Sequence, residues 1–467
     1  MMRLLVAALV LGTMGSVPAS AGELRVGAAR EVITPPPGTP MAGYYFERAA
    51  EEVHDDLFAK AIVIESGEMR AALVALDVIT TTRDLVVDAR RAIEEATGIP
   101  GDHVMISATH AHTGPVIADR SRRSQSLGGG SDLSQRYREG LPAKIAEAVR
   151  RADAAKVPAK ASAARGSESS IAFNRRFHMV DGSVGWNPGK RNPRIVKPAG
   201  VIDPSVPIVY FESLDGDPLA VYVNYAVHLD NVGGPAISAD LPHTLSKLIA
   251  EFKGPEVVTV FTAGCCGDIN HIDVFWAEPQ KGFENAARMG IILAAEVLRN
   301  WPKLEDVEDV ALRIDREMVA LPLPEISPED VPEAEAVVER HRSGSTPQPS
   351  FLETVNAYKV LDVAARDGEP NEVEVQVIAL GDLIAWVSLP GEIFVELGLE
   401  IKQDSPFQHT IIAELANGSI GYIPSRRAHG QGNYEVVSAR CAEGSGEMLV
   451  DAAVRMLKAL HGEAIKE

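Results

Sequence analysis

The sequence predicts a protein of the α/β class with α+β character, in which helices flank layered, mixed β-sheets. Short apolar runs of strand length recur along the chain, and stretches with helical periodicity lie between them. This interleaving is typical of a layered sheet protein, and because strict βαβ repetition is not seen, we expect mixed sheets. The 467 residues, 46% of them hydrophobic, are enough for a large core.

The individual elements follow from local pattern. Short apolar runs predict strands at 59–65, 71–77, 208–212, 219–227, 257–262, 383–389 and 410–415. Amphipathic periodicity predicts helices at 84–96, 137–152, 241–252, 283–300 and 447–460. Two segments are poor in pattern: residues 123–132 are predicted to be a glycine- and serine-rich loop, and 322–348 a lid or linker with one helix at 327–341.

The first residues have the pattern of a secretory signal peptide. A positive start (Met1-Met2-Arg3) precedes an apolar run from Leu4 to Leu11, and Ala19-Ser20-Ala21 offers a cleavage site. The run is too short to cross a bilayer, which needs about 20 apolar residues. We therefore expect a signal peptide at 1–21, one domain at 22–467, no transmembrane segment in the mature chain, and a protein that is periplasmic or secreted.

Charge and cysteine content narrow the possible partners and bonds. The formal net charge of −20 argues against a nucleic-acid partner, because a polyanion would be repelled. Export would permit a disulfide between Cys441 and either Cys265 or Cys266, and three small buried thiols are equally compatible with the sequence. The spacing of a zinc knuckle is not present.

A histidine motif gives the first indication of chemistry. The segment 107–115, Ser-Ala-Thr-His-Ala-His-Thr-Gly-Pro, follows an apolar run that reads as a buried strand. If the backbone stays extended, His110 and His112 point the same way and could bind a transition metal or one metal and its water. His228 ends a second predicted strand, and Glu392 follows a third. Strand ends of a layered α/β protein converge at one sheet edge.

This set of side chains suits a metal. Two histidines and a carboxylate are enough for Zn²⁺, with positions left for the phenol of Tyr422 and a water. The same donors also suit non-haem iron. Nothing in the sequence indicates an oxygenase co-substrate site, so zinc is the metal we predict.

The ordered motifs resemble the catalytic domain of the neutral ceramidase family. They are Ile33-Thr34-Pro35, Met41-Ala42-Gly43-Tyr44, Ala-Thr-His-Ala-His-Thr-Gly-Pro, Asn174-Arg175, Ala226-Val227-His228, Pro390-Gly391-Glu392, and Tyr422 with Tyr434. The resemblance runs from about Gly27 to near the C-terminus. It implies a ceramidase-like fold, zinc ligation by His110, His228, Glu392 and Tyr422, and a substrate or water pocket lined by His112, Arg175 and Tyr434.

Two departures from the family bear on activity. Where the family has a serine near the scissile amide, in Gly-Asp-Val-Ser-Pro-Asn, this chain reads Gly267-Asp268-Ile269-Asn270-His271-Ile272. Asn270 could donate to a developing oxyanion, or could simply be an asparagine in a glycine-rich turn. The chain stops at Glu467, soon after the last predicted helix, so the C-terminal immunoglobulin-like domain of the family is not expected.

The sequence thus predicts an exported zinc hydrolase that cleaves an amide (N-acyl) bond by attack of a water activated on the metal, with His112 moving the proton. Arg175, Tyr434 and Asn270 would stabilise the oxyanion. Ester or lactone hydrolysis at the same site is the alternative within enzymes, and a non-catalytic, metal-containing binding protein is the alternative outside them. The expected partner is a small-molecule or lipid-like substrate, and the oligomeric state is not predicted.

Overall fold

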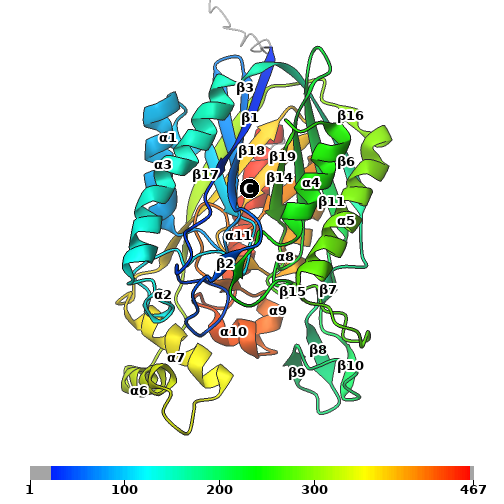
Figure 1. Ribbon diagram of the computed structural model, residues 1–467. Helices are drawn as coiled ribbons and strands as arrows, with labels where there is room; N and C mark the ends of the chain where they lie inside the picture. Colours follow the sequence, from blue (N-terminus) through cyan, green and yellow to red (C-terminus); the bar gives the residue numbers. More distant parts are fainter. Residues whose placement is uncertain (1–22, 463–467) are drawn as a thin grey trace, which may run out of the picture.

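The largest element of the fold is a nine-stranded sheet, seen in a computed structural model that describes residues 23–462 (Figure 1). The predicted signal peptide at 1–21 lies outside the described residues. The strand order is β14-β12-β11-β6-β1-β3-β4-β5, with β16 beside β6. Their bounds are β1 (Leu24–Val32), β3 (Phe58–Ser66), β4 (Met69–Leu76), β5 (Val104–Ala108), β6 (Val157–Ser167), β11 (Ser205–Ser213), β12 (Pro218–Tyr225), β14 (Val258–Ala263) and β16 (Glu305–Asp306).

A second, four-stranded sheet packs face to face against the first. Its order is β17-β18-β19-β21, with bounds Leu312–Leu321, Asn371–Leu380, Ile384–Ser388 and His409–Ala413. Alternate side chains of one strand serve two layers, as strand geometry requires. On β3, Ile62 and Ile64 share a core with Ile378 and Trp386 of the second sheet, while Ala61 and its neighbours face helices. Both faces of the large sheet are therefore buried.

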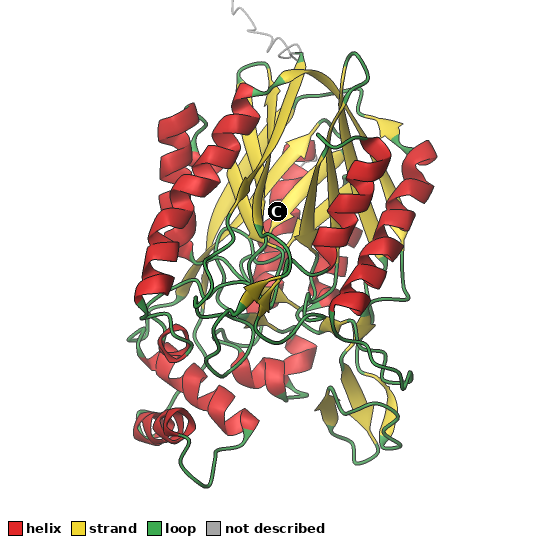
Figure 2. Ribbon diagram, viewed as in Figure 1, coloured by secondary structure: helices red, strands yellow, loops and turns green. Residues whose placement is uncertain are grey.

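Helices cover the outer faces of both sheets, which makes four layers (Figure 2). The large sheet is covered by α1 (Arg83–Thr97), α3 (Asp132–Ala154), α4 (Leu241–Lys253) and α5 (Phe283–Asn300). The small sheet is covered by α8 (Val395–Asp404) and α11 (Ser445–His461). Both sheets are mixed, because β4–β5, β12–β14 and β19–β21 are parallel pairs among antiparallel ones. The predicted fold class is confirmed.

Smaller elements complete the fold, and most of them lie at one end of the sheets (Figure 1). The short strands are β2 (Glu52–Val53), β7 (Phe173–Asn174), β8 (Arg176–Met179), β9 (Val184–Trp186), β10 (Ile195–Pro198), β13 (Ala236–Ile237), β15 (Ile269–Asn270), β20 (Glu392–Ile393) and β22 (Tyr422–Ile423). The other helices are α2 (Arg122–Ser126), α6 (Asp330–Ser343), α7 (Phe351–Ala364), α9 (Arg426–His429) and α10 (Tyr434–Ser438), with 3₁₀ turns η1 (Gly101–His103) and η2 (Trp301–Lys303).

All seven predicted strands and five predicted helices are present, and the structure adds β1, β6, β17, β18 and α7. The predicted loop at 123–132 is wrong in part, because Ser121 caps the short helix α2 by accepting the backbone N–H of Ser124. The segment 322–348 contains α6, which packs against α7.

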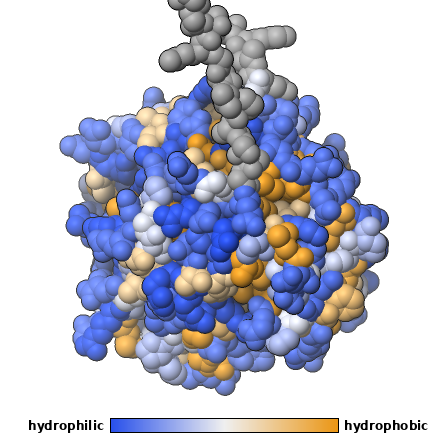
Figure 3. Space-filling view, turned by 90° about the horizontal axis from the view of Figure 1, so that it is seen from above, coloured by the Kyte–Doolittle hydropathy of each residue, from blue (hydrophilic) through white to orange (hydrophobic). Residues whose placement is uncertain are grey.

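Three further findings concern the predicted chemistry of the chain. Cys265, Cys266 and Cys441 are all free and buried. Of the two alternatives, the structure therefore shows three separate thiols and no disulfide among them. Within residues 23–462, none of the helices combines the length and apolar character needed to span a bilayer. Figure 3 shows the end of the molecule where β1 begins, which is mostly hydrophilic with scattered apolar side chains.

Candidate metal centre

The candidate site lies at the opposite end, beyond the carboxyl ends of β5, β12 and β19. His110 and His228 follow β5 and β12 of the large sheet, and Glu392 follows β19 of the small sheet. Because the members of each parallel pair point their carboxyl ends the same way, the loops after them meet at one edge. The predicted convergence of these loops is present.

The chain leaves the extended conformation before it reaches His110. β5 ends at Ala108, and His110 has a φ of 71°, in the left-handed region that costs a residue with a side chain free energy. The turn is held by hydrogen bonds from the His110 N–H to the Val78 carbonyl (3.0 Å) and from Nδ1 to the Ile79 carbonyl (2.8 Å). His110 and His112 do approach each other, but through this turn and not through strand alternation.

The donor atoms of the predicted ligands gather in one place. Glu392 Oε2 lies 3.2 Å from His228 Nε2 and 3.5 Å from His110 Nε2. The Tyr422 hydroxyl lies 3.5 Å from His228 Nε2. His112 Nε2 is 3.3 Å from His110 Nε2, and the donor nitrogens of the three histidines all lie within 4.8 Å of one another. His112, predicted to move a proton, is therefore also placed as a ligand could be.

Local pairing brings Tyr422 beside Glu392. β20 and β22 are parallel partners, with Glu392 opposite Tyr422. Gly267 passes so close that a Cβ there would lie 2.5 Å from the Glu392 carbonyl oxygen, so only glycine fits. The Gly267 carbonyl in turn accepts from Arg175. The predicted ligands Glu392 and Tyr422 are thus linked to Arg175 through Gly267 and the β20–β22 pairing.

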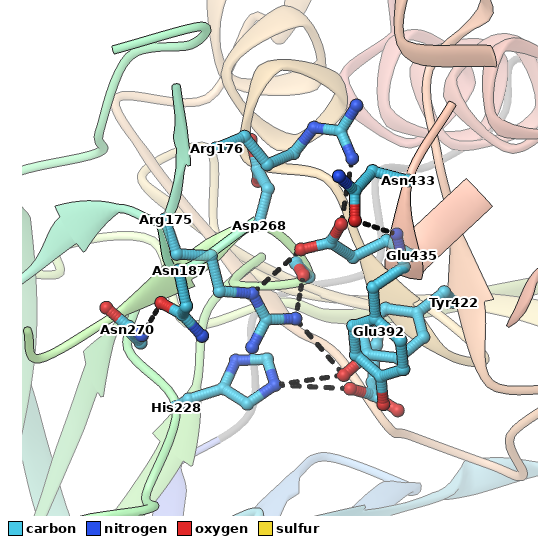
Figure 4. Close-up of polar contacts among 12 residues, drawn as sticks. Arg175, Arg176, Asn187, His228, Asp268, Asn270, Glu392, Tyr422, Asn433 and Glu435 are labelled. Atoms are coloured by element: carbon cyan, nitrogen blue, oxygen red, sulfur yellow. Dashed lines mark hydrogen bonds and ion pairs between the residues drawn. The ribbon is translucent and has the colours of Figure 1, made fainter. Parts of the chain in front are cut away.

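Arg175 reaches the site through Tyr422 (Figure 4). Its Nη2 lies 3.1 Å from the Tyr422 hydroxyl, and its Nε donates to Glu435 Oε1 at 2.9 Å. Arg176 donates to the other oxygen of Glu435 at 2.8 Å. A guanidinium next to the phenol favours the phenolate form that a metal ligand would need.

The pKa shifts follow from burial and from these contacts. Burial disfavours the charged form of Glu392, but its contacts with His110 and His228 outweigh this effect and hold its pKa well below the usual value. Burial, together with Arg175 and His110, lowers the pKa of His228 to about 3. Burial raises the pKa of Tyr422 well above 10, and Glu392 adds to this while Arg175 opposes it.

His112 has its own acidic neighbour. Its Nδ1 lies 3.7 Å from Asp230 Oδ1, and Asp230 also contacts Lys281 (2.9 Å) and the Tyr44 hydroxyl (3.2 Å). Burial lowers the pKa of His112 well below 6.5, with Asp230 opposing and His110 adding to the shift. His112 is therefore neutral at neutral pH and able to accept a proton.

The remaining predicted residues lie further from the donor atoms. The Tyr434 ring packs 5.2 Å from the Tyr422 ring, centroid to centroid. The Asn270 amide donates to Asn187 (2.9 Å) and accepts from the Ile272 N–H (3.0 Å), and Figure 4 shows it beside Asn187. Their predicted catalytic roles stay predictions.

The donor set fits zinc. His110 must donate from Nδ1 to the Ile79 carbonyl, so in its neutral form Nε2 presents a lone pair toward a carboxylate oxygen. Two electron-rich atoms at that distance call for a proton or a cation between them. Imidazole, carboxylate and phenol are ligands that Zn²⁺ accepts, and His228 Nδ1 is buried with no hydrogen-bond partner among the described residues.

A cavity of about 480 Å³ opens onto two of the predicted ligands, His110 and Glu392. Its apolar wall includes Ile79, Val116 and Leu127, which form one small cluster with Ala42. The volume is in the range of small-molecule sites.

Three residues near the site carry no predicted role: Asp230 beside His112, Glu435 beside Arg175, and Arg123 in the lining of the cavity. Asp230 lies two residues after His228, a spacing that could have drawn attention to it. Glu435 pairs with Arg175 across 260 residues of chain, and no sequence spacing encodes that contact.

Comparisons with known proteins agree with the fold. No family model matches the chain, and no curated protein matches it. Among solved structures, a neutral ceramidase from Pseudomonas aeruginosa has a TM-score of 0.74 at 18% identity, covering 95% of this chain and 76% of that one. A ceramidase complexed with C2 has a TM-score of 0.73 at 16% identity, covering 95% and 77%. The chain therefore has a neutral-ceramidase-like fold.

Proposed function

We propose that the protein is a metal-dependent hydrolase that cleaves an amide (N-acyl) bond, with zinc as its metal. The observation that carries the proposal is the meeting of His110, His228, Glu392 and Tyr422 beside a cavity that His110 and Glu392 line. The structural neighbours support amide cleavage, since they are ceramidases and ceramide is an N-acyl compound.

The residues suit hydrolysis by water. The chemistry that zinc supplies when bound is a lowered pKa for water and polarisation of a carbonyl. The water oxygen forms a bond to the carbonyl carbon, and the carbon–nitrogen bond breaks. His112, neutral because burial lowers its pKa, accepts the proton from water and returns it to the leaving amine.

Arg175 acts in this proposal as a positioning residue, because its hydrogen bond ends on the Tyr422 hydroxyl. Tyr434 supports the same phenol by ring packing. A donor for the oxyanion is still required, and Asn270 stays the proposed one although its amide bonds Asn187 in this structure.

The test combines metal analysis with turnover in matched histidine variants. His110→Ala removes a proposed ligand, and His178→Ala removes a histidine of β8 outside the cluster. We expect His110→Ala to lose stoichiometric zinc and chelator-sensitive cleavage of N-acyl substrates, and His178→Ala to keep both.

A panel of N-acyl, ester and lactone substrates separates the alternatives. Chelator-sensitive turnover of esters or lactones alone would replace amide cleavage. Tight stoichiometric zinc with no turnover on any substrate would favour a non-catalytic binding protein. A fully active, zinc-loaded His110→Ala protein would contradict the ligand assignment.

A further inference from the structure

The cavity beside the ligands is rich in arginine although the whole chain is strongly acidic. Its lining contains five arginines and three carboxylates, in a chain with a formal net charge of −20. The arginines are Arg120, Arg122, Arg123, Arg366 and Arg440, and the carboxylates are Asp119, Asp362 and Glu392. A positive cavity in an acidic protein indicates selection by charge, because the local field concentrates anions.

Not all of these arginines are free to bind a ligand. Arg440 is paired with Asp362 at 2.6 Å, and Arg366 donates through Nε to the Glu369 carbonyl. The carboxylate of Asp119 accepts from Ser121 at 2.6 Å and makes no ion pair with the described residues. The lining arginines whose side chains make no hydrogen bond or ion pair with the described residues are therefore Arg120, Arg122 and Arg123, on the segment around α2.

Arg123 is the best placed of these. Among residues 23–462 its side chain makes no hydrogen bond and no ion pair, and its Nε is buried without a partner. Its guanidinium lies over the Tyr45 ring, 4.3 Å from the centroid, which holds it in place. Burial disfavours its charge, but the field of Tyr45, Tyr434 and Glu392 outweighs this and raises its pKa.

An arginine that is held in place and lacks a partner is costly to keep half-buried. A guanidinium fork matches the two oxygens of a carboxylate or phosphate. The lining of the same cavity also includes the apolar side chains of Ile79, Val116 and Leu127. One cavity therefore offers an apolar surface for a hydrocarbon chain, a cation for an acidic group, and the proposed metal ligands His110 and Glu392.

We propose that the substrate is an amide that carries an anionic group as well as an apolar acyl chain, and that Arg123 binds this group. The inference rests on the proposed function, because it places the scissile carbonyl at His110 and Glu392. It goes beyond that function by excluding a fully neutral amide as the preferred substrate.

The test uses three substrates that share a twelve-carbon acyl chain and release a primary amine. N-lauroylglycine carries a carboxylate, N-lauroyl-O-phosphoethanolamine carries a phosphate, and N-lauroylethanolamine is neutral. We expect the zinc-loaded protein to prefer one or both acidic amides, and the two acidic arms identify which anion is bound.

Arg123→Met should lower the ratio of kcat/KM for acidic over neutral substrate about tenfold or more, the usual size of a lost charge-assisted contact. Arg123→Lys should keep part of the preference, because it keeps the charge and loses the fork. Arg136→Met is the control: this α3 arginine has a 77% exposed side chain and does not line the cavity. It should leave the ratio unchanged.

Equal or better turnover of the neutral amide, or an unchanged ratio in Arg123→Met, would overturn the inference and leave the proposed function standing. If none of the three amides is hydrolysed, the proposed function fails, and calorimetry then decides the inference by itself. Binding of N-lauroylglycine but not N-lauroylethanolamine, lost in Arg123→Met, supports the anion site. Equal binding of both overturns it.

Discussion

Arg175 and Arg176 share the carboxylate of Glu435, and only Arg175 touches a proposed metal ligand (Figure 4). The chain thus holds two neighbouring buried guanidiniums with different second contacts. Arg176 donates to the Gly432 carbonyl at 2.9 Å, while Arg175 donates to the Tyr422 hydroxyl. Substituting Arg175 and Arg176 separately therefore distinguishes an effect on the fold from an effect on metal binding.

At this scale we predict that Arg175→Met weakens zinc binding about tenfold or more relative to Arg176→Met, the size typical of lost partners of metal ligands. Without Arg175 the Tyr422 phenolate loses its stabilising charge, so zinc binding should also need a higher pH. Competition with a chromophoric chelator at several pH values measures both. Equal weakening in the two variants would mean that Arg175 only supports the fold.

That His110, His228 and Glu392 come together could be predicted from the sequence, because each follows an apolar run that ends at one sheet edge. The contacts that shift the pKa values of these side chains could not be predicted in this way. Glu435 and Asp230 become partners of Arg175 and His112 only in the folded chain. The turn at His110, with its positive φ, was likewise hidden, because an extended backbone predicts the same approach of His110 and His112.

Helix α1 is tied to the second sheet by a buried ion pair. Arg90 donates to both oxygens of Glu374 on β18, at 2.9 and 2.7 Å, and to the Val104 carbonyl. Its neighbour Arg91 has a 66% exposed side chain and pairs with Asp88 on the surface. Adjacent positions of one helix therefore carry a buried and an exposed ion pair.

At the scale of elements we predict that Arg90→Leu lowers the free energy of unfolding by about 3 kcal/mol or more, because it leaves Glu374 buried with less compensation. Arg91→Leu should change it by less than about 0.5 kcal/mol. Urea unfolding measures both. Burial opposes ionisation of Glu374, but Arg90 and Arg83 lower its pKa below 4.5, so this pair stabilises above that pH.

The difference between wild type and Arg90→Leu should therefore shrink as the pH falls through the lowered pKa of Glu374, where the carboxylate becomes protonated in the folded state. A difference that stays constant with pH would show that Arg90 stabilises by packing and its hydrogen bond to Val104 alone.

Some elements had sequences that conceal their structure. β6 reads Val-Pro-Ala-Lys-Ala-Ser-Ala-Ala-Arg-Gly-Ser, whose alanines favour helix, yet it pairs with β11 from Ala159 to Ser167. Helix α7 has buried residues on most sides, so it lacks the polar face that marks a helix in sequence. Pairing and burial in the tertiary structure decide both, and local pattern does not carry that information.

Across the whole molecule the three cysteines lie in the interior. Burial raises the pKa of Cys441 to about 11, and burial also raises the pKa of Cys265 and Cys266. A thiol reacts as its thiolate, so these groups are protected twice, by low access and by protonation.

We therefore predict that a thiol reagent modifies none of the three cysteines in the native protein within the time that modifies all three in denaturant. The melting temperature should not change when a reductant is added. Mass spectrometry of the labelled protein and a thermal melt provide these measurements. A native protein with fewer than three thiols after denaturation would contradict the free cysteines.

The two sheets also touch beside the candidate metal site. The Ala108 N–H at the end of β5 donates to the Leu415 carbonyl after β21, and the Asn417 N–H donates to the Ile106 carbonyl. A cation held by His110 and His228 from one sheet and by Glu392 from the other would fasten the two halves of the core together. The free energy of binding such a cation would add to the stability of the folded state. Newly made chains would then be kept or degraded according to how much metal their compartment supplies.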